Sequence, residues 1–152
     1  AKVLNDLDIH KRLDHIEETM NLNIPKKQPS LLNWDQVAEM HSSGLVQVGS
    51  HSRRHIRLTE AISDQDLEDE IINSKNEIKD KSGADVDIFC FPNGDYSQAA
   101  LKLVNQNYLG AVTTEPGWNS RASDPFLLHR TSIHQDIACK RNQFLSRLSG
   151  WM

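Results

Sequence analysis

The feature that most constrains the fold of this chain is the alternation of short apolar runs with helix-length segments. Apolar runs occupy residues 45–49, 86–91 and 111–114, and a fourth strand-like run spans residues 127–134. Where strands alternate with helices, consecutive strands are parallel and their crossovers are right-handed. We therefore expect a parallel α/β sheet, either open or closed into a barrel, in which the loops after the strands gather on one side.

Residues with capping chemistry mark where the main helices begin and end. Asn33, with Gln36 three residues later, predicts a capping box, and Gly44 ends that helix. Ser63 predicts the start of a long helix that ends near Gly83. The segments between the apolar runs are therefore helical, as a parallel sheet requires.

Two further helices are expected, over residues 1–23 and after Ser97. His10 and His15 lie in the first of these and are expected to be surface residues. The acidic residues at 64–70 fall in the first turns of the long helix, where carboxylates suit the helix dipole. We interpret that run as a solvated face and not as a site.

The composition predicts one globular domain and excludes two classes of partner. A chain of 152 residues can bury a real core, and 38% of its residues are hydrophobic. A net charge of −4 with interspersed signs gives no basic surface for nucleic acid. No apolar run approaches the length of a transmembrane span, and the first residues show no signal peptide. No pattern specifies the compartment or the oligomeric state.

A histidine pair follows the first apolar run directly. His51 and His55 are separated by Ser52, Arg53 and Arg54, and two residues four apart share a face if the segment makes one helical turn. Neutral imidazole is the commonest protein ligand of zinc. Serine beside the first histidine excludes the zinc-protease motif, which needs glutamate there. The pair is therefore a candidate half of a metal site, with two solvated loop histidines as the alternative.

Three motifs occur in a fixed order around this pair. They are Asn-Trp-Asp-Gln-Val at 33–37, Gly-Ser-His-Ser-Arg-Arg-His at 49–55 and Phe-Cys-Phe-Pro-Asn-Gly-Asp-Tyr at 89–96. Weaker matches follow at 113–117 and 130–134. In order and spacing the chain resembles the polysaccharide deacetylases of the NodB-homology type, carbohydrate esterase family 4, which remove N-acetyl groups from sugars.

The resemblance covers about residues 30–136 and implies a distorted (β/α) barrel of the polysaccharide deacetylase type. It implies metal-dependent hydrolysis of a carbon–nitrogen, non-peptide bond, with N-acetyl groups leaving an amino-sugar polysaccharide or oligosaccharide. In the family an Asp and two histidines hold a divalent ion; the histidines match His51 and His55, and the ion is expected to be zinc, with cobalt or iron also suited. The family's late catalytic histidine, which protonates the leaving amine, matches His134, with His129 as a second candidate.

The loop after the second apolar run matches the family's oxyanion motif. Pro92 and Asn93 stand where the family usually has Pro-Tyr, so the resemblance implies that the backbone N–H of Asn93 helps to hold the oxyanion. We expect Pro92, Asn93, Tyr96 and Trp118 to contact an N-acetylated glycan. Trp34 is expected to pack in the core.

The chain departs from the family at its N-terminal side. The family's first motif is a strand ending in Asp-Asp, which supplies the catalytic base and the third metal ligand, and the Asn-Asp-Leu-Asp at 5–8 follows no strand. We therefore expect an incomplete barrel, with residues 1–30 as a helical insertion or linker, 31–136 as the C-terminal two-thirds of the catalytic domain and 137–152 as a C-terminal helix. On this expectation the chain alone binds zinc weakly and hydrolyses nothing appreciable.

Two other functions fit the same residues. A deacetylase-like domain without the carboxylates would bind glycans or partner proteins and catalyse nothing. A different metal hydrolase would complete its site with Asp95 or Glu115. A carboxylate in bonding distance of an ion held by His51 would favour the second of these.

Overall fold

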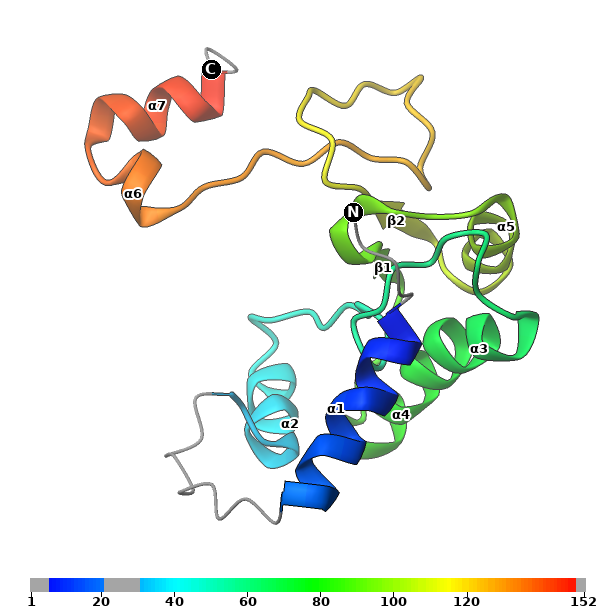
Figure 1. Ribbon diagram of the computed structural model, residues 1–152. Helices are drawn as coiled ribbons and strands as arrows, with labels where there is room; N and C mark the ends of the chain where they lie inside the picture. The colour runs from blue at the N-terminus through cyan, green and yellow to red at the C-terminus, as the bar shows by residue number, and fades with distance from the viewer. Residues whose placement is uncertain (1–5, 21–30, 150–152) are drawn as a thin grey trace.

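The computed structural model describes residues 6–20 and 31–149, which form helices around a small parallel sheet (Figure 1). The elements in chain order are α1 (Asp6–Met20), α2 (Trp34–Ser42), α3 (Asp64–Glu68), the π-helical turn η1 (Asp69–Asn73), α4 (Ser74–Ser82), β1 (Ile88–Cys90), the 3-10 turn η2 (Pro92–Gly94), α5 (Gln98–Asn107), β2 (Gly110–Val112), α6 (Gln135–Ala138) and α7 (Arg141–Ser149). Strands and helices alternate from α4 to β2, as the sequence predicts.

The sheet is parallel, and its central pair is β1 with β2. Phe89 lies opposite Ala111 in this pair. Isolated parallel bridges extend the ladder on both sides, from Ser50 to Phe89 and from Val112 to Leu128. The spatial order therefore follows the chain order, and the prediction of consecutive parallel strands is confirmed.

The two outer strands are shorter than predicted. Residues 45–49 form no ladder, and only Ser50 beyond them makes a bridge. Of residues 127–134, only Leu128 makes a bridge. A parallel strand is stabilised by neighbours on both sides, and within residues 6–20 and 31–149 these two segments have a neighbour on one side alone. The predicted strand lengths were wrong there because pairing, and not the apolar pattern, decides them.

The predicted helix boundaries are confirmed where capping residues set them. The Gln36 amide donates to Asn33 Oδ1, and the Asn33 amide donates to Gln36 Oε1, both at 2.9 Å. Ser63 and Ser97 accept main-chain N–H groups at the starts of α3 and α5. Gly83 ends α4 at φ 74°, a left-handed conformation that favours glycine. These boundaries depend on local chemistry, which the sequence contains.

The long helix predicted after Ser63 is interrupted by η1. The wider π turn leaves the Ile71 carbonyl to accept hydrogen bonds from Ser74 Oγ at 3.0 Å and from Tyr108 Oη at 2.7 Å. It also turns Glu70 inward, where its side chain is fully buried. The interpretation of the whole acidic run as a solvated face was therefore wrong, because Glu70 belongs to the interior. Single π turns of this kind are frequent at functional sites.

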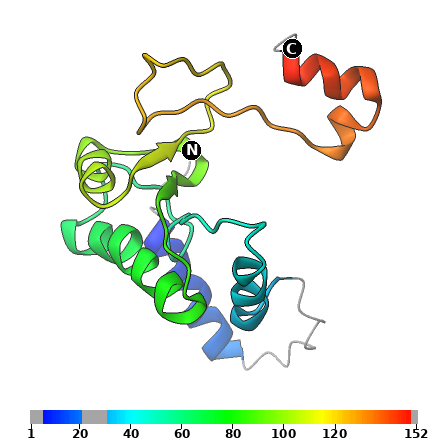
Figure 2. The same ribbon diagram turned by 180° about the vertical axis from the view of Figure 1, so that it is seen from behind.

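The core lies between the sheet and the helices α3 to α5, which stand together on one side of it in Figures 1 and 2. The ring of Phe89 packs edge to face against Phe91 and Tyr108, with centroids 5.3 and 5.2 Å apart. The helices α6 and α7 lie apart from this body in both views, at the end of an extended segment. The other buried core residues are Ile56, Leu58, Leu67, Ile71, Val86, Ala100, Val104 and Ala111.

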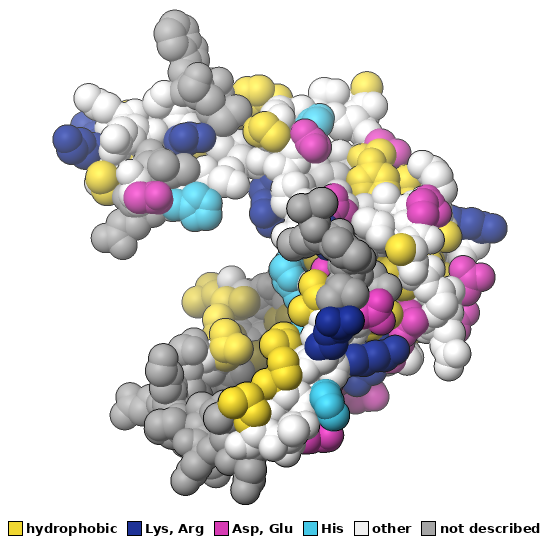
Figure 3. Space-filling view, in the orientation of Figure 1, with side chains coloured by type: hydrophobic (Ala, Val, Ile, Leu, Met, Phe, Trp, Pro, Cys, Tyr) yellow, Lys and Arg dark blue, Asp and Glu magenta, His cyan; other side chains and the backbone are white. Residues whose placement is uncertain are grey.

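The helix α1 joins the core only through its first turns, where Leu7 packs against it. Further along, Leu13, Ile16 and Met20 are exposed, and Figure 3 shows hydrophobic side chains following the length of this helix. Trp34 at the start of α2 is also exposed, with Lys81 Nζ 5.1 Å from its ring centroid, so the expectation of a core position for it was wrong. No helix among the described residues is both long and apolar enough to cross a membrane.

Candidate functional site

The histidine loop, residues 51–55, follows the bridge at Ser50. The rings of His51 and His55 lie with centroids 4.7 Å apart and planes at 81°. No helical turn brings them together, because Ser52 and His55 have positive φ angles of 65° and 55°. The two imidazoles are therefore close, as a helical turn would have made them, but it is an irregular loop that brings them together.

The strand β1 orients the first imidazole. His51 Nδ1 lies 2.7 Å from the Cys90 carbonyl oxygen. A carbonyl can only accept, so Nδ1 carries the proton, and Nε2 of the neutral ring keeps its lone pair. This arrangement, with one ring nitrogen donating to a carbonyl, is the usual second contact of a metal-binding histidine. The main-chain N–H of His55 donates to Ser52 Oγ at 3.0 Å, which fixes the other end of the loop.

The backbone of the histidine loop is held by the buried carboxylate of Glu70. Its Oε2 accepts the amides of Arg53 and Arg54, both at 3.0 Å, and its Oε1 accepts Arg54 Nε at 2.6 Å. The bond to Glu70 raises the pKa of the Arg54 guanidinium. The sequence did contain a signal for this carboxylate, because Glu70 is three residues after buried Leu67 and four before buried Ser74, on one helix face.

A second layer of ion pairs surrounds the loop on its exposed side. Arg53 Nη1 lies 2.6 Å from Asp69 Oδ1, and Arg53 Nε lies 3.1 Å from Glu77 Oε2. Arg54 Nη2 lies 3.3 Å from Asp69 Oδ2. These pairs involve side chains alone, so they differ from the contacts of Glu70 with the main chain.

The charge layer predicts an acid-sensitive contribution to stability. A hydrogen bond from Asn73, and then Arg53, hold the pKa of Asp69 below its ordinary value of 3.8. A carboxyl whose pKa is lowered by folding stabilises the protein above its unfolded pKa, and this contribution is lost as the pH falls through the folded pKa. The wild type is expected to lose unfolding free energy between about pH 6 and pH 3, and Asp69→Asn to lose roughly 0.5–1 kcal/mol less. The difference is small because the Asp69 side chain is 28% exposed and solvent screens its charge. Urea titrations at the two pH values measure this.

The control for that experiment is Asp87→Asn, which changes an exposed carboxylate beside β1. It is expected to leave the acid sensitivity as it is in the wild type. Equal acid sensitivity of Asp69→Asn and the wild type would show that the charge layer contributes nothing.

The second candidate loop is η2, directly after β1. Asn93 is exposed and left-handed, at φ 56° and ψ 5°. The amides of Gly94 and Asp95 donate within this turn, whereas the Asn93 amide precedes them, where an N–H has no acceptor inside the turn. Thr114 Oγ1 donates to the Asn93 carbonyl at 3.1 Å and so fixes the peptide plane on the other side. An available amide on a fixed turn is suited to hold an anionic oxygen.

The η2 turn requires glycine at position 94 for two reasons. Gly94 has φ 78°, and a Cβ there would lie 2.2 Å from Thr114 Oγ1 and 3.1 Å from the Thr114 amide nitrogen. We expect Gly94→Ala to lower the free energy of unfolding by roughly 2–4 kcal/mol, the sum of a left-handed alanine and an overpacked contact. Gly83→Ala is the matched control, because its φ is 74° and no heavy atom lies within 4 Å of the added Cβ.

That control is expected to lose only about 1–2 kcal/mol, from the backbone conformation alone. Chemical denaturation of both variants gives the comparison. Equal losses would mean that the contact with Thr114 does not constrain the turn.

A surface pocket of about 250 Å³ joins the two loops, because His55 and Asn93 both line it. Its opposite wall comes from α1 and includes His10, which the sequence treated as a surface residue of no function. The lining residues are Asp6, Ile9, His10, His55, Arg57 and Asn93. The pocket is therefore lined by two imidazoles, those of His10 and His55, and by Asn93 of the η2 turn.

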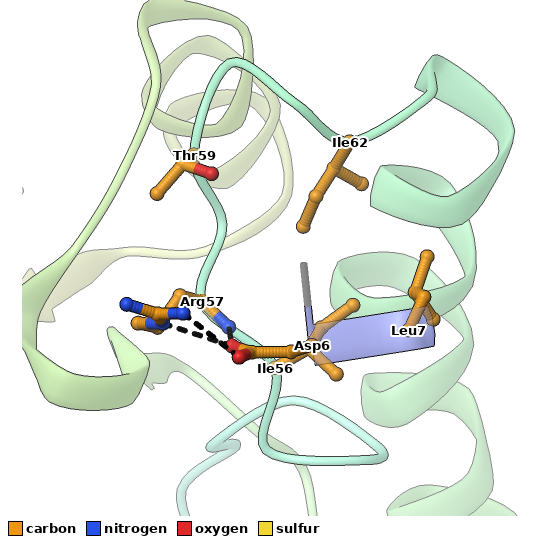
Figure 4. Close-up of a pocket in the computed structure, with 6 residues that line it drawn as sticks. All are labelled: Asp6, Leu7, Ile56, Arg57, Thr59 and Ile62. Atoms are coloured by element: carbon orange, nitrogen blue, oxygen red, sulfur yellow. Dashed lines mark hydrogen bonds and ion pairs between the residues drawn. The ribbon is translucent and has the colours of Figure 1, made fainter. Parts of the chain in front are cut away.

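The pocket wall from α1 is attached by an ion pair (Figure 4). The Arg57 amide and Nε donate to Asp6 Oδ2 at 2.9 and 3.0 Å, and Nη2 donates to Oδ1 at 2.9 Å. Leu7, Ile56 and Ile62 lie around this pair and line a small adjoining cavity of about 30 Å³. Asp6 thus fixes α1 to the segment just after the histidine loop.

Cys90, whose carbonyl contacts His51, also has a thiol. Burial raises the pKa of this thiol, and the charge of Arg130 offsets part of the rise. Arg130 Nη1 lies 3.5 Å from the sulfur. Because metals bind the thiolate form, a raised pKa makes this sulfur a poor ligand.

The remaining predicted site residues do not line this pocket. His134 is exposed and immediately precedes α6, which lies apart from the sheet in Figures 1 and 2. Trp118 is 68% exposed. The ring of Tyr96 packs against Phe91 at 4.9 Å between centroids, and Pro92 is buried. Of the four predicted glycan contacts, the pocket includes Asn93 alone.

His129, the second match to the family's late histidine, belongs to the loop that follows β2. Its amide donates to Asn119 Oδ1, and Asn119 Nδ2 donates to its carbonyl, both at 2.9 Å. A Cβ at Gly117 would lie 3.0 Å from the His129 ring. The ring therefore packs within its own loop and does not reach the pocket lining.

A third protein ligand beside the histidine pair is not found in the described part of the chain. Within residues 6–20 and 31–149, no three side chains of His, Cys, Asp or Glu come together in a group that could hold an ion. Asp95 and Glu115 therefore do not complete a site with His51 and His55. The alternative of a different hydrolase with one of these carboxylates has no support in the structure.

Comparison with known proteins gives the class. The family model of the polysaccharide deacetylases matches residues 3–112, which include both candidate loops. The Bacillus subtilis protein YxkH, which bears the family's name, is 30% identical over 103 residues, covering 67% of this chain and 36% of YxkH. The chain belongs to the polysaccharide deacetylase family.

Solved structures agree with this assignment in their fold. The polysaccharide deacetylase BC0361 from Bacillus cereus aligns with a TM-score of 0.65 at 20% identity, over 90% of this chain and 47% of its own. The Streptococcus pyogenes deacetylase PplD, solved in complex with acetate, aligns with a TM-score of 0.67 at 24% identity, over 76% of this chain and 50% of its own. These proteins have a distorted (β/α)8 barrel, and the chain spans about half of their length and about a third of YxkH.

Proposed function

We propose that the protein hydrolyses N-acetyl groups from an amino-sugar polysaccharide or oligosaccharide in a metal-dependent reaction. Family membership supports the deacetylation, and one observation supports the metal: His51 is oriented by the Cys90 carbonyl with its ring 4.7 Å from that of His55. The two imidazoles would hold the ion, which by their donor chemistry would be zinc, or cobalt or iron. The acetate in the PplD structure is the product that such a reaction would release.

The residues of this chain would have distinct roles in that reaction. A divalent ion supplies polarisation of the acetyl carbonyl and activation of a water molecule. Cys90 keeps the proton of His51 on Nδ1, so that Nε2 is the donor nitrogen. The Asn93 amide would donate to the oxygen that gains charge as the acetyl carbon becomes tetrahedral, a contribution whose loss costs about 3 kcal/mol in comparable sites.

The leaving amine must receive a proton, and an imidazole is the usual general acid near neutral pH. We assign this role to His134 from its place in the family pattern. His10 is the competing candidate, because it lines the pocket of His55 and Asn93. Comparing kcat of His134→Ala and His10→Ala separates them, and the variant with the larger loss identifies the acid.

The deciding experiment measures acetate and free amine released from N-acetylglucosamine oligomers by the full-length gene product. We expect release with zinc or cobalt, loss of release on removal of the metal by a chelator, and recovery when the metal is added back. Release that continues in the chelated protein would overturn the metal dependence. Absence of release from any N-acetylated amino sugar would overturn the deacetylation.

One observation favours a second function, a deacetylase-like domain that binds glycans without catalysis. Within the described residues the histidine pair has no carboxylate partner. This function predicts that N-acetylglucosamine oligomers bind, as seen by calorimetry, while acetate release stays at the level of buffer in the presence of zinc. Turnover of the bound oligomer would exclude it.

A further inference from the structure

We propose that Glu70 is a positioning residue for the two imidazoles: its buried carboxylate sets the backbone of the histidine loop and so the orientation of His51 and His55. The proposal rests on the proposed metal site. It adds a residue from a helix that the family motifs do not include.

The contacts of Glu70 are specific to the histidine loop. One carboxylate oxygen accepts two consecutive amides, those of Arg53 and Arg54, at 3.0 Å each. Two successive N–H groups can point at one oxygen only where the chain turns sharply, and this is the turn that separates His51 from His55. The other oxygen accepts Arg54 Nε at 2.6 Å, so both oxygens of the carboxylate are engaged.

The turn needs such support because it contains strained residues. Ser52 and His55 have φ angles of 65° and 55°, which L residues with a side chain rarely adopt. Strained backbone persists where surrounding contacts determine it, and bonds from N–H groups to an ionised carboxylate are among the strongest available. The two residues between these strained positions, Arg53 and Arg54, both donate their amides to Glu70.

Ser74, the first residue of α4 after the π turn, fixes the histidine loop at a second point. Ser74 Oγ lies 2.7 Å from Ser50 Oγ, and Ser50 immediately precedes His51. Ser74 also donates to the Ile71 carbonyl, which in turn accepts from Tyr108 Oη in the core. Ser74 of α4 therefore holds the chain just before His51, and Glu70 of the π turn holds it just before His55.

The test compares Glu70→Gln with Asp69→Asn in the full-length protein. Both replace a carboxylate by its isosteric amide, but Asp69 contacts side chains alone, those of Arg53, Arg54 and Asn73. In Glu70→Gln one accepting oxygen becomes an NH₂ donor that faces an N–H group of Arg53 or Arg54, so that hydrogen bond is lost and the loop relaxes. We expect Glu70→Gln to weaken Co²⁺ binding by about 10- to 100-fold, the range found for residues that orient metal ligands. Asp69→Asn is expected to bind Co²⁺ as the wild type does.

A second measurement does not depend on the metal. Hydrogen exchange of the Arg53 and Arg54 amides is expected to be slow in the metal-free wild type and faster in Glu70→Gln, with the exchange of the core amide of Tyr108 unchanged. Fast exchange of both loop amides in the wild type would overturn the proposal, whether or not the variant folds.

The two readouts separate the possible failures. If the wild type binds no Co²⁺, the proposed metal site fails, and the exchange result alone decides whether Glu70 holds the loop. If the wild type binds Co²⁺ and Glu70→Gln binds it equally well, the positioning role is overturned while the proposed function stands. Weaker binding together with faster loop exchange and an intact core supports the positioning role.

Discussion

Replacing His51 by alanine is expected to weaken zinc and cobalt binding by at least about 100-fold, the upper end of what loss of a ligand's supporting contact costs. The substitution removes the Nε2 donor and also the contact of Nδ1 with the Cys90 carbonyl at 2.7 Å. His55→Ala is expected to have a similar effect, since its ring is the neighbour of His51 at 4.7 Å. Isothermal titration of the apoprotein with each metal measures both.

The matched control is His15→Ala. His15 is an exposed histidine on α1, and its main-chain carbonyl accepts the hydroxyl of Thr19. Removing its imidazole is expected to leave the affinity unchanged. If His51→Ala and His15→Ala bind the metals equally well, His51 is not a ligand and the two imidazoles are solvated loop residues.

The largest effect on stability is expected from Phe89→Ala, with a loss of about 3–5 kcal/mol in the free energy of unfolding. Phe89 is fully buried in the central strand, and its ring contacts those of Phe91 and Tyr108. Its removal leaves a cavity between the sheet and α5 that these large rings cannot fill. Urea denaturation followed by circular dichroism gives the loss.

The control lies one residue away on the opposite face of the same strand. Ile88 is 42% exposed, so Ile88→Ala keeps the strand and removes much less buried surface. We expect a loss of about 1 kcal/mol or less. Losses of the same size at both positions would show that β1 has no preferred buried face, contrary to the structure.

The sequence predicted the elements whose causes are local. The caps at Asn33, Ser63 and Ser97, and the left-handed glycine at position 83, each follow from one or two side chains near the helix end. The parallel order of the sheet also followed, because it depends on the alternation of strands and helices. The lengths of the two outer strands were overestimated, because a strand's length depends on pairing with neighbours far away in the chain.

The candidate site was predicted in part, for similar reasons. The proximity of His51 and His55 followed from their spacing, but the backbone that produces it did not, because nothing in Ser52 or His55 as residue types specifies a positive φ. Glu70 was missed because it lies in an acidic run, where four neighbouring carboxylates concealed the one on the buried face. His10 was missed because the packing of α1 onto the loops is a tertiary contact.

The short strand β1 and the η2 turn that follows it position both the candidate metal ligand His51 and the candidate oxyanion donor Asn93. Its last residue, Cys90, orients His51 through a carbonyl, and only three residues later Asn93 presents its amide in the η2 turn. The separation between the candidate ligand and the candidate oxyanion donor is therefore set by a single stretch of backbone at the centre of the sheet. The helices α1, α6 and α7 contribute no residue to that stretch, so the separation does not depend on their positions.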